Sequence, residues 1–457
     1  MFGIFGICGL LVFILARPQE YIDVLQKLPM LYLCCAGAVG GFVLDVKLRR
    51  NDPRPVPMLT WVIAFLVWAT ICSAVKAGNA LQANIIACGI LFILFSTIAH
   101  GVQTIRAFRM VAATVMTVCL FLTIVCIHQG LQDRSCIVTD PEHPGEGTPD
   151  GRPCEMADAC YENDAEPGSE YRCEKAGMFG TYSIEDRVRY RGELHDPNEL
   201  GLTVCIGAFA MLIGFANQRR RPLTIVSTAI GGLLVLYCVS LTQSRGAILV
   251  FALVASVYAV RRFGIAGIIA AGVAALPLIA LGGRSGDKAD QSTQLRYEAW
   301  AAGLQMFKES PVFGVGQRQF AEHHFMTAHN SYVLSLAELG FIGFVLFICM
   351  LFLTVKTLIR GVIDLEHVPG ARPAQVWAMV LLSAFAGALF SINTLSFCYH
   401  TVLWVFLGLG GAWVSVVRHH KPDFDVRITA RDLFFIIVGC AAYALVILPI
   451  FVRLKGE

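Results

Sequence analysis

The chain has little charge for its length. Only 15% of its 457 residues are Asp, Glu, Lys or Arg, and 56% are hydrophobic, whereas ordinary soluble domains are about 25% charged. The hydrophobic excess falls in runs of roughly 18–22 residues, the length that crosses a bilayer. The shortage of charge therefore excludes a soluble globular protein and predicts an all-α polytopic membrane protein with about 12–13 transmembrane helices.

The charge that is present lacks a dominant sign. The formal net charge is +3, which says little about partners because charge in a membrane protein is sorted by side. A lipid bilayer is the expected surrounding, and no nucleic-acid partner is expected.

The predicted spans, with ends soft by several residues, are 2–16, 28–46, 57–75, 80–99, 108–128, 198–216, 223–243, 246–260, 264–281, 331–355, 374–393, 400–417 and 432–452.

The first apolar run lacks a small-residue cleavage site before Arg17, so we expect it to be retained rather than removed as a signal peptide.

Lys and Arg clusters fall in alternate loops, and all are cytoplasmic if the N-terminus is inside. They are Lys47/Arg49/Arg50/Arg54, Arg106/Arg109, Arg219–Arg221, Arg261/Arg262, Lys356/Arg360/Arg372 and Arg418/Lys421. The last span would leave Arg453 and Lys455 outside, so either 432–452 does not fully cross or the tail breaks the rule.

This topology predicts five regions. They are N-terminal transmembrane helices at 1–128, an outer Cys-containing loop at 129–197, central transmembrane helices at 198–281, a second outer loop at 282–330 and C-terminal transmembrane helices at 331–457.

The first outer loop lacks any C-x-x-C spacing. It holds four of the sixteen cysteines, namely Cys136, Cys154, Cys160 and Cys173. An oxidising outer compartment favours disulfides for these four. Zinc is the competing reading, and it is disfavoured because zinc usually takes closely spaced cysteine pairs, which this loop lacks. Four cysteines allow three connectivities, and the sequence does not choose among them.

The end of this loop carries alternating arginines, Arg187, Arg189 and Arg191. In an extended segment alternate residues share a face, so the three could hold phosphate or carboxylate; the alternative is charge balance against the acidic half of the loop. His195 then precedes Asp196-Pro197-Asn198, a helix start in which Asp caps and Pro fits the first turn. His195 is a candidate site residue by its position at the outer surface.

The second outer loop contains an amphipathic helix with Trp300, Leu304 and Phe307 on one face, which we expect at the membrane interface. Arg296 lies four residues before Trp300 and shares its face. His323 and His324 lack a carboxylate or Cys partner at metal-ligand spacing, so no metal site is predicted.

Arg245 stands between two long apolar runs, in Leu241-Thr-Gln-Ser-Arg-Gly-Ala247. A charge at membrane depth costs at least about 2.5–3.5 kcal/mol and normally faces a cavity, although snorkelling to the headgroups is an alternative. His329 opens the span in Met326-Thr-Ala-His-Asn-Ser-Tyr. Several arginines around one histidine near a helix start predict a site for a lipid-linked phosphate. Asn330 and Glu338 follow, with capping an equal explanation for Asn330. Glu338 lies about two helical turns after Ser331, so we expect it to face the same way as the site end of this helix and to be a candidate partner for an arginine.

The order of these motifs resembles the O-antigen ligase and Wzy-type polymerase superfamily. "SRGA" between spans, "R-x-x-x-W", "PVFGVG" and "HNSYVLSLAELGFIG" carry the resemblance, with "DPNELG" and "RPQEY" beside them. It implies a GT-C-like glycosyltransferase of the bacterial inner membrane, active on the periplasmic face in O-antigen or exopolysaccharide assembly. The donor would be a glycan on undecaprenyl diphosphate and the acceptor a hydroxyl on a glycan or lipid, with no cofactor and no metal. Other polysaccharide-assembly proteins are candidate partners.

The resemblance also implies roles. His329, Arg245 and Arg296 would be catalytic, the arginines on the diphosphate and His329 as the base, which makes 282–330 the catalytic loop. Substrate-binding candidates are Arg189, Arg191, His195, Trp300, Asn330 and Glu338. The Cys-bearing insert departs from the family pattern and puts the acceptor in doubt.

Polymerase, ligase and protein O-oligosaccharyltransferase share these motifs, so the sequence does not separate them. A transporter would instead show inverted repeats and charges at the midplane; no internal repeat is visible, and the charged candidates lie at the outer edge.

Overall fold

A computed structural model describes residues 2–139, 147–162, 165, 168–218, 221–264, 266–267, 269 and 287–455. The all-α polytopic class is confirmed, because helices dominate this part of the chain. Ten helical runs within it are long and apolar enough to cross a membrane: Met30–Lys47, Leu59–Lys76, Gly78–Gly101, Ile105–Gly130, Pro197–Gln218, Pro222–Leu241, Ser331–Asp364, Arg372–Ser391, Thr401–Arg418 and Ala430–Lys455.

The helices are α1 (Phe2–Leu15), α2 (Asp23–Gln26), α3 (Met30–Lys47), α4 (Leu59–Lys76), α5 (Leu81–Gly101), α6 (Ile105–Gly130), α7 (Pro197–Val204), α8 (Ala210–Gln218), α9 (Pro222–Leu241), α10 (Arg245–Phe263), α12 (Asp287–Glu309), α13 (Phe320–His323), α14 (Ser331–Asp364), α15 (Arg372–Ser391), α16 (Thr401–Arg418), α17 (Ala430–Ala442) and α18 (Leu448–Lys455). π-helical turns join α7 to α8 and α17 to α18. Most of the predicted span at 264–281 lies outside the described residues, and α1 is shorter than a typical crossing helix.

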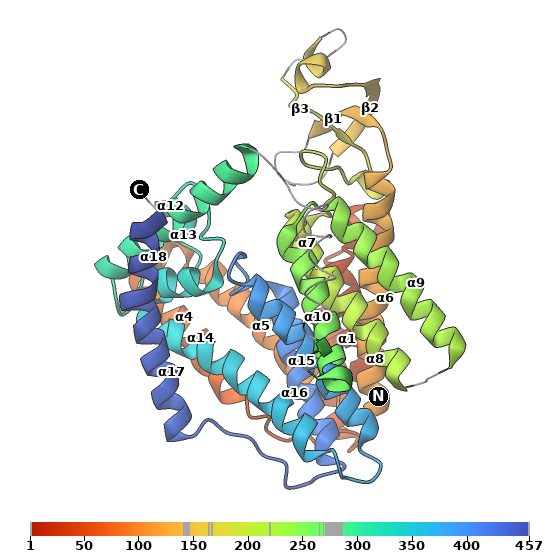
Figure 1. The fold of residues 1–457 in the computed structure, drawn as a ribbon, viewed down its shortest axis with the longest axis vertical. Coiled ribbons are helices and arrows are strands. Elements are labelled where there is room, and N and C mark those ends of the chain that lie inside the picture. Colours follow the sequence, from red (N-terminus) through yellow and green to blue (C-terminus); the bar gives the residue numbers. More distant parts are fainter. Residues whose placement is uncertain are drawn as a thin grey trace.

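The basic loops gather at one end of the bundle. Arg418 after α16 donates to the carbonyl of Pro55 (2.9 Å), which precedes α4. Lys421 pairs with Asp364 at the end of α14 (3.3 Å), and His419 lies 2.9 Å from the carbonyl oxygen of Gln103, before α6. The starts of α7, α10 and α14 lie at the opposite end, where α12 and the strands also lie (Figure 1).

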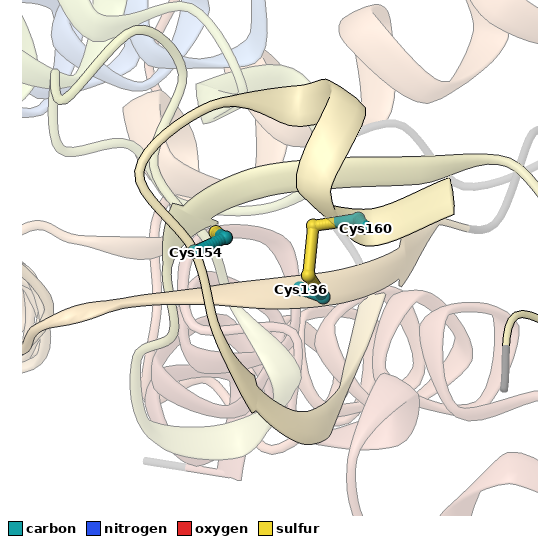
Figure 2. A group of neighbouring side chains, drawn as sticks. All are labelled: Cys136, Cys154 and Cys160. Carbon is teal, nitrogen blue, oxygen red and sulfur yellow. A yellow bond between two sulfur atoms is a disulfide. The ribbon is translucent and has the colours of Figure 1, made fainter. Parts of the chain in front are cut away.

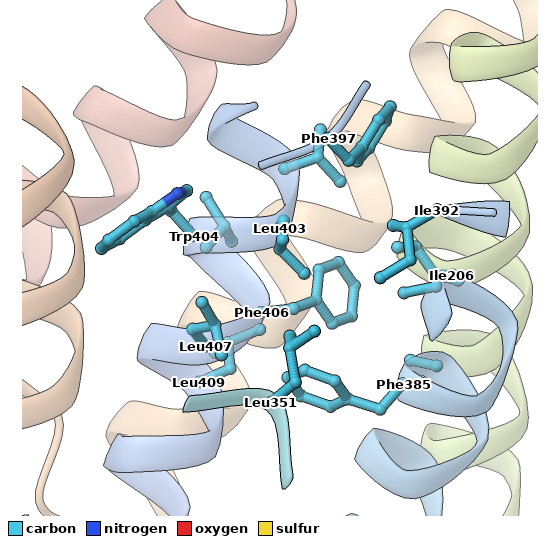
Figure 3. Close-up of a cluster of buried hydrophobic side chains, with 14 of the residues drawn as sticks. Ile206, Leu351, Phe385, Ile392, Phe397, Leu403, Trp404, Phe406, Leu407 and Leu409 are labelled. Atoms are coloured by element: carbon cyan, nitrogen blue, oxygen red, sulfur yellow. The ribbon is translucent and has the colours of Figure 1, made fainter. Parts of the chain in front are cut away.

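Helix α16 forms the centre of the packed core. Trp404, Trp413 and Phe406 along it are almost fully buried. Phe406 lies near Leu351 of α14 and Phe385 of α15 (Figure 3). Gly411 lets α16 approach α5, since a Cβ there would lie 2.7 Å from the Cβ of Ala99. Close approach at small residues is how membrane helices pack without a hydrophobic driving force between them.

Helix α14 is broken at Gly340, whose φ of 65° and ψ of −170° are outside the helical range. The break frees backbone carbonyls, and the preceding segment Pro311–Gly316 satisfies them. Val315 and Gly316 donate to the carbonyls of Ala337 and Glu338, each at 2.9 Å. Irregular backbone in a membrane protein is tolerated where protein groups satisfy it in this way.

The Cys-containing insert is a small antiparallel sheet in the order β2-β1-β3, with β1 at Arg134–Thr139, β2 at Gly147–Pro153 and β3 at Tyr171–Lys175. The sequence gives no apolar alternation that would predict it. Two disulfides, Cys136–Cys160 and Cys154–Cys173, cross-link it. The sulfurs of Cys136, Cys154 and Cys160 lie within 4.8 Å of one another (Figure 2); because these sulfurs are in disulfides, they offer no thiolate to a metal.

The last apolar run, α17 to α18, extends along the full height of the bundle. At its start Asp432 pairs with Lys356 near the far end of α14 (2.6 Å). At its end Phe451 packs on Tyr297 and Trp300 of α12, with ring centroids 5.4 Å apart in both cases. The run therefore joins the basic end to the opposite end, and Arg453 and Lys455 break the charge pattern of the other loops.

Candidate functional site

A cleft of about 270 Å³ opens at the end of the bundle opposite the basic loops. It brings together residues from four separate parts of the chain: Arg187, Asp196, Asn198, Gln243, Ser244, Arg245, Gly246, Ser292, Thr293, Arg296, Met326 and His329. All three residues that the family resemblance implies as catalytic, Arg245, Arg296 and His329, are among them.

Three helices begin at this cleft. The Asp196 side chain caps α7 by accepting from the Asn198 N–H (2.7 Å). Ser244 precedes α10, and its Oγ accepts from the Ala247 N–H (3.2 Å). His329 directly precedes Asn330, which caps α14. The N-terminal end of a helix carries partial positive charge and favours anions, so the convergence of three such ends suits a strongly anionic ligand.

Three guanidinium groups line the same cleft. Arg245 is the first residue of α10, and Arg296 comes from α12. Arg187 is nearly buried, and its Nε donates to the carbonyl of Thr242 (2.8 Å). Burial lowers the pKa of the Arg187 guanidinium from its ordinary value, with Asp196 opposing this effect. Fixed guanidinium groups match the geometry of phosphate oxygens.

His329 is held from both sides along the chain. The carbonyl of Ala328 before it accepts from the indole N–H of Trp300 (2.9 Å). The side chain of Asn330 after it accepts from the N–H groups of Tyr332 (2.9 Å) and Val333 (3.2 Å). His329 itself has a φ of 44°, a left-handed conformation that is uncommon outside glycine. Such backbone strain persists only where the surroundings fix it.

Burial lowers the pKa of His329, Asp196 raises it, and Arg296 and His195 lower it further. The imidazole is therefore neutral at a lower pH than an exposed histidine, which leaves a nitrogen lone pair free to accept a proton at neutral pH.

The alternating arginines separate in the structure. Arg189 is buried, donates from Nε to the Tyr182 carbonyl (3.0 Å) and lies 4.3 Å from the centre of the Tyr182 ring. Arg191 is buried, donates to the Phe179 carbonyl and lies over the ring of Tyr21. The prediction of one shared anion-binding face is therefore wrong for Arg189 and Arg191. The alternating pattern did not predict one shared face correctly, because Val188 and Tyr190 between the arginines are buried too.

Trp300 and His195 lie beside the cleft without lining it. Trp300 fixes the loop that carries His329 and packs edge-on against Tyr297, with centroids 5.9 Å apart. His195 is exposed, and its Nδ1 lies 2.7 Å from the carbonyl oxygen of Gly192. Trp300 thus contributes position to the site through the backbone of Ala328.

Glu338 lies away from the cleft, two turns into α14, and is 2% exposed. Its carboxylate accepts from the backbone N–H groups of Arg318 (2.9 Å) and Phe320 (3.1 Å). Arg318 thus bonds to Glu338 through its backbone amide. Glu338 holds the segment before α13 onto the broken helix.

Sequence reasoning missed two features of this end. Asp196 and Asn198 line the cleft, although the pattern "DPNE" was fully explained by capping. His400, the N-cap of α16, is buried and stacks on Phe397 at 3.9 Å. Its Nε2 lies 3.2 Å from the Glu193 carbonyl oxygen and 3.7 Å from the Glu199 carboxylate. Asp196 and His400 are both polar residues at the start of a helix, the pattern that also marks His329-Asn330 in the sequence.

Residues 230–348 match a family model described as O-antigen ligase. The matched segment contains the second part of α9, all of α10, α12 and α13 and the first half of α14, and with them Arg245, Arg296 and His329. The resemblance inferred from the motif order is confirmed by this match. No curated protein matches the chain.

Proposed function

From the O-antigen ligase domain at residues 230–348, we propose that this chain is a glycosyltransferase of the ligase or polymerase type. It takes a glycan from undecaprenyl diphosphate and passes it to an acceptor hydroxyl on a glycan or lipid. It does so in the bacterial inner membrane, with the cleft facing the periplasm, because the Lys- and Arg-rich loops that mark the cytoplasmic side lie at the other end.

The observation that carries this proposal is the composition of the cleft. It combines three guanidinium groups, three helix N-termini and one histidine of lowered pKa. A diphosphate leaving group needs positive charge where its own negative charge develops, and a hydroxyl acceptor needs a base. Transporters place their charges at the midplane on broken helices, whereas these groups lie at helix ends.

The reaction follows as one displacement. His329 takes the proton from the acceptor hydroxyl as its oxygen attacks the anomeric carbon of the donor sugar. A new carbon–oxygen bond forms to the acceptor, and the bond from the anomeric carbon to the diphosphate oxygen breaks. Arg187, Arg245 and Arg296 stabilise the charge that appears on the diphosphate. These guanidinium groups supply the positive charge for the leaving group, so the proposed step uses no metal and no cofactor.

A direct test uses the purified protein in liposomes with an undecaprenyl-diphosphate-linked glycan. Release of undecaprenyl diphosphate that depends on acceptor, with equimolar growth of the acceptor, is the expected result. Release that never depends on acceptor would refute the transferase proposal. A deletion strain separates the reactions, since a polymerase defect accumulates single repeat units on the carrier and a ligase defect accumulates long unattached chains.

A further inference from the structure

Asp196 caps α7 with only one of its two carboxylate oxygens. Its Oδ1 accepts from the backbone N–H of Asn198 (2.7 Å) and from the Asn198 side-chain amide (2.8 Å). Both bonds fall on Oδ1, so capping occupies one of the two carboxylate oxygens. The same side chain lines the cleft that contains His329, where the other charged groups of the lining are Arg187, Arg245 and Arg296.

The carboxylate is held in place by a chain of hydrogen bonds. The Asn198 side chain donates to Asp196 and accepts from Nη2 of Arg187 (3.1 Å). Arg187 in turn donates to the Thr242 carbonyl in the turn before α10 (2.8 Å). A capping aspartate alone needs none of these partners. The network fixes a negative charge in a cleft that otherwise favours anions. That charge lowers the affinity for an anionic ligand, a cost that a contribution to the reaction would offset.

The negative charge of Asp196 favours the protonated form of His329. The titratable and charged groups around it are His195 and Asp196 at the start of α7, Arg245 of α10, Arg296 of α12 and Arg187. Of these, Asp196 alone favours the protonated imidazole, while burial, Arg296 and His195 disfavour it. A base that accepts a proton in the transition state becomes an imidazolium ion, and a fixed carboxylate nearby lowers the free energy of that ion.

We propose that Asp196 is the acidic partner of His329, a positioning residue that stabilises the imidazolium formed when His329 takes the acceptor proton. The inference rests on the proposed transferase function and extends it to a residue outside the matched segment. Asp196 does not take the proton itself. Its charge acts across the cleft, while its capping bonds keep it there.

The substitution Asp196→Asn separates charge from capping, because Asn caps helices as well as Asp does. We expect turnover with the lipid-linked donor to fall at least about tenfold, part of the roughly 10²–10⁴-fold that general-base catalysis contributes. The acid limb of the turnover-against-pH profile should move to lower pH, since loss of the carboxylate lowers the pKa of His329 further. The KM for the donor should not rise, since a negative charge has left an anion-binding cleft.

Asp196→Glu is the matched variant that keeps the charge and disturbs the cap. It should lower the melting temperature while the acid limb stays near its wild-type position. Wild-type turnover and an unmoved acid limb in Asp196→Asn, beside an inactive His329→Gln, would overturn this inference and leave the transferase proposal standing. Full activity of His329→Gln would instead overturn the proposed function. Should Asp196→Asn accumulate poorly, Asp196→Ser, another capping residue, carries the same test of charge.

Discussion

The start of α14 and the break in the same helix at Gly340 differ in what their polar groups contact. At the start of α14, His329 faces a cleft with three guanidinium groups. Two to three turns later, the polar groups around the break at Gly340 are satisfied within the protein. Glu338 accepts two backbone N–H groups, and the carbonyl of Leu339 accepts from the Trp68 indole (2.9 Å).

This difference separates function from support. A polar group that is costly at membrane depth and fully paired holds the fold together. A polar group gathered with others around an open cleft lies where a ligand can reach it. Position also divides the arginines, since Arg187 lines the cleft while Arg189 and Arg191 bond to carbonyls in the protein interior.

The largest expected effect is on the arginines of the cleft. Arg245→Gln and Arg296→Gln should each lower turnover by about 10²–10³-fold, the usual effect of removing one group that stabilises a leaving charge. Amounts in the membrane and melting temperature should stay near wild type. Turnover is measured as release of undecaprenyl diphosphate from donor in liposomes.

Arg191→Lys is the contrasting variant. It should lower the melting temperature, because the buried planar guanidinium that bonds to the Phe179 carbonyl and lies over the Tyr21 ring is replaced by an ammonium group. Turnover per folded molecule should stay unchanged. Equal losses of turnover in Arg191→Lys and Arg296→Gln would break the distinction between cleft and interior arginines.

At the helix break, Gly340→Ala tests support rather than chemistry. A Cβ at this position would lie 2.2 Å from the carbonyl oxygen of Val312, and φ is 65°. The backbone conformation alone costs a side-chain-bearing residue about 1–3 kcal/mol. We expect a lower melting temperature in detergent and less protein in the membrane.

Gly89→Ala is the matched control for this substitution. Gly89 lies in α5, where a Cβ would meet nothing within 4 Å. It should leave the melting temperature unchanged or raise it, because Ala has the higher helix propensity. An unaltered melting temperature in Gly340→Ala would show that the break is not fixed by its neighbours.

The pH dependence of turnover sharpens the account of the cleft. The neutral imidazole is the active base, and burial lowers the pKa of His329 below the usual value of about 6.5. Turnover should therefore be constant at neutral pH and fall only below about pH 6.5, as the imidazole becomes protonated. An acid limb centred above that value would mean that another group controls the reaction or that the carboxylate outweighs burial.

The smallest effect on turnover is expected at the insert. Replacing Cys154 and Cys173 together with Ser should destabilise the sheet by about 2–4 kcal/mol, the typical contribution of one disulfide. Its unfolding can be followed by proteolysis of the insert in intact vesicles. Donor hydrolysis or transfer to a small acceptor should change less than twofold, since none of the residues lining the cleft lies in the sheet.

Much of the fold could be predicted because its causes are local. Apolar runs of membrane-spanning length and the positions of Lys and Arg predicted the helices and the end at which the basic loops gather. The motifs predicted that Arg245, Arg296 and His329 belong to one site, and the structure places them around one cleft. The roles of these residues stay predictions.

The rest depends on tertiary contacts that the local pattern does not contain. Alternation placed Arg187, Arg189 and Arg191 on one face, but burial of the whole segment gave each a different partner. Glu338 lay at helical spacing from the site end of α14, yet the break at Gly340 and the segment before α13 gave it backbone partners. Asp196 was hidden because one role, capping, already explained it.

The most direct test of the account is the turnover of His329→Gln beside His323→Gln in the same liposome assay. His323 lies in the same loop, is exposed, and has its Nδ1 2.9 Å from the Gln319 carbonyl oxygen, so its loss should leave turnover unchanged. We expect His329→Gln to reach the membrane in wild-type amount and to lose at least about 10²-fold in turnover. Wild-type turnover in His329→Gln would contradict the proposed role of His329 as the base.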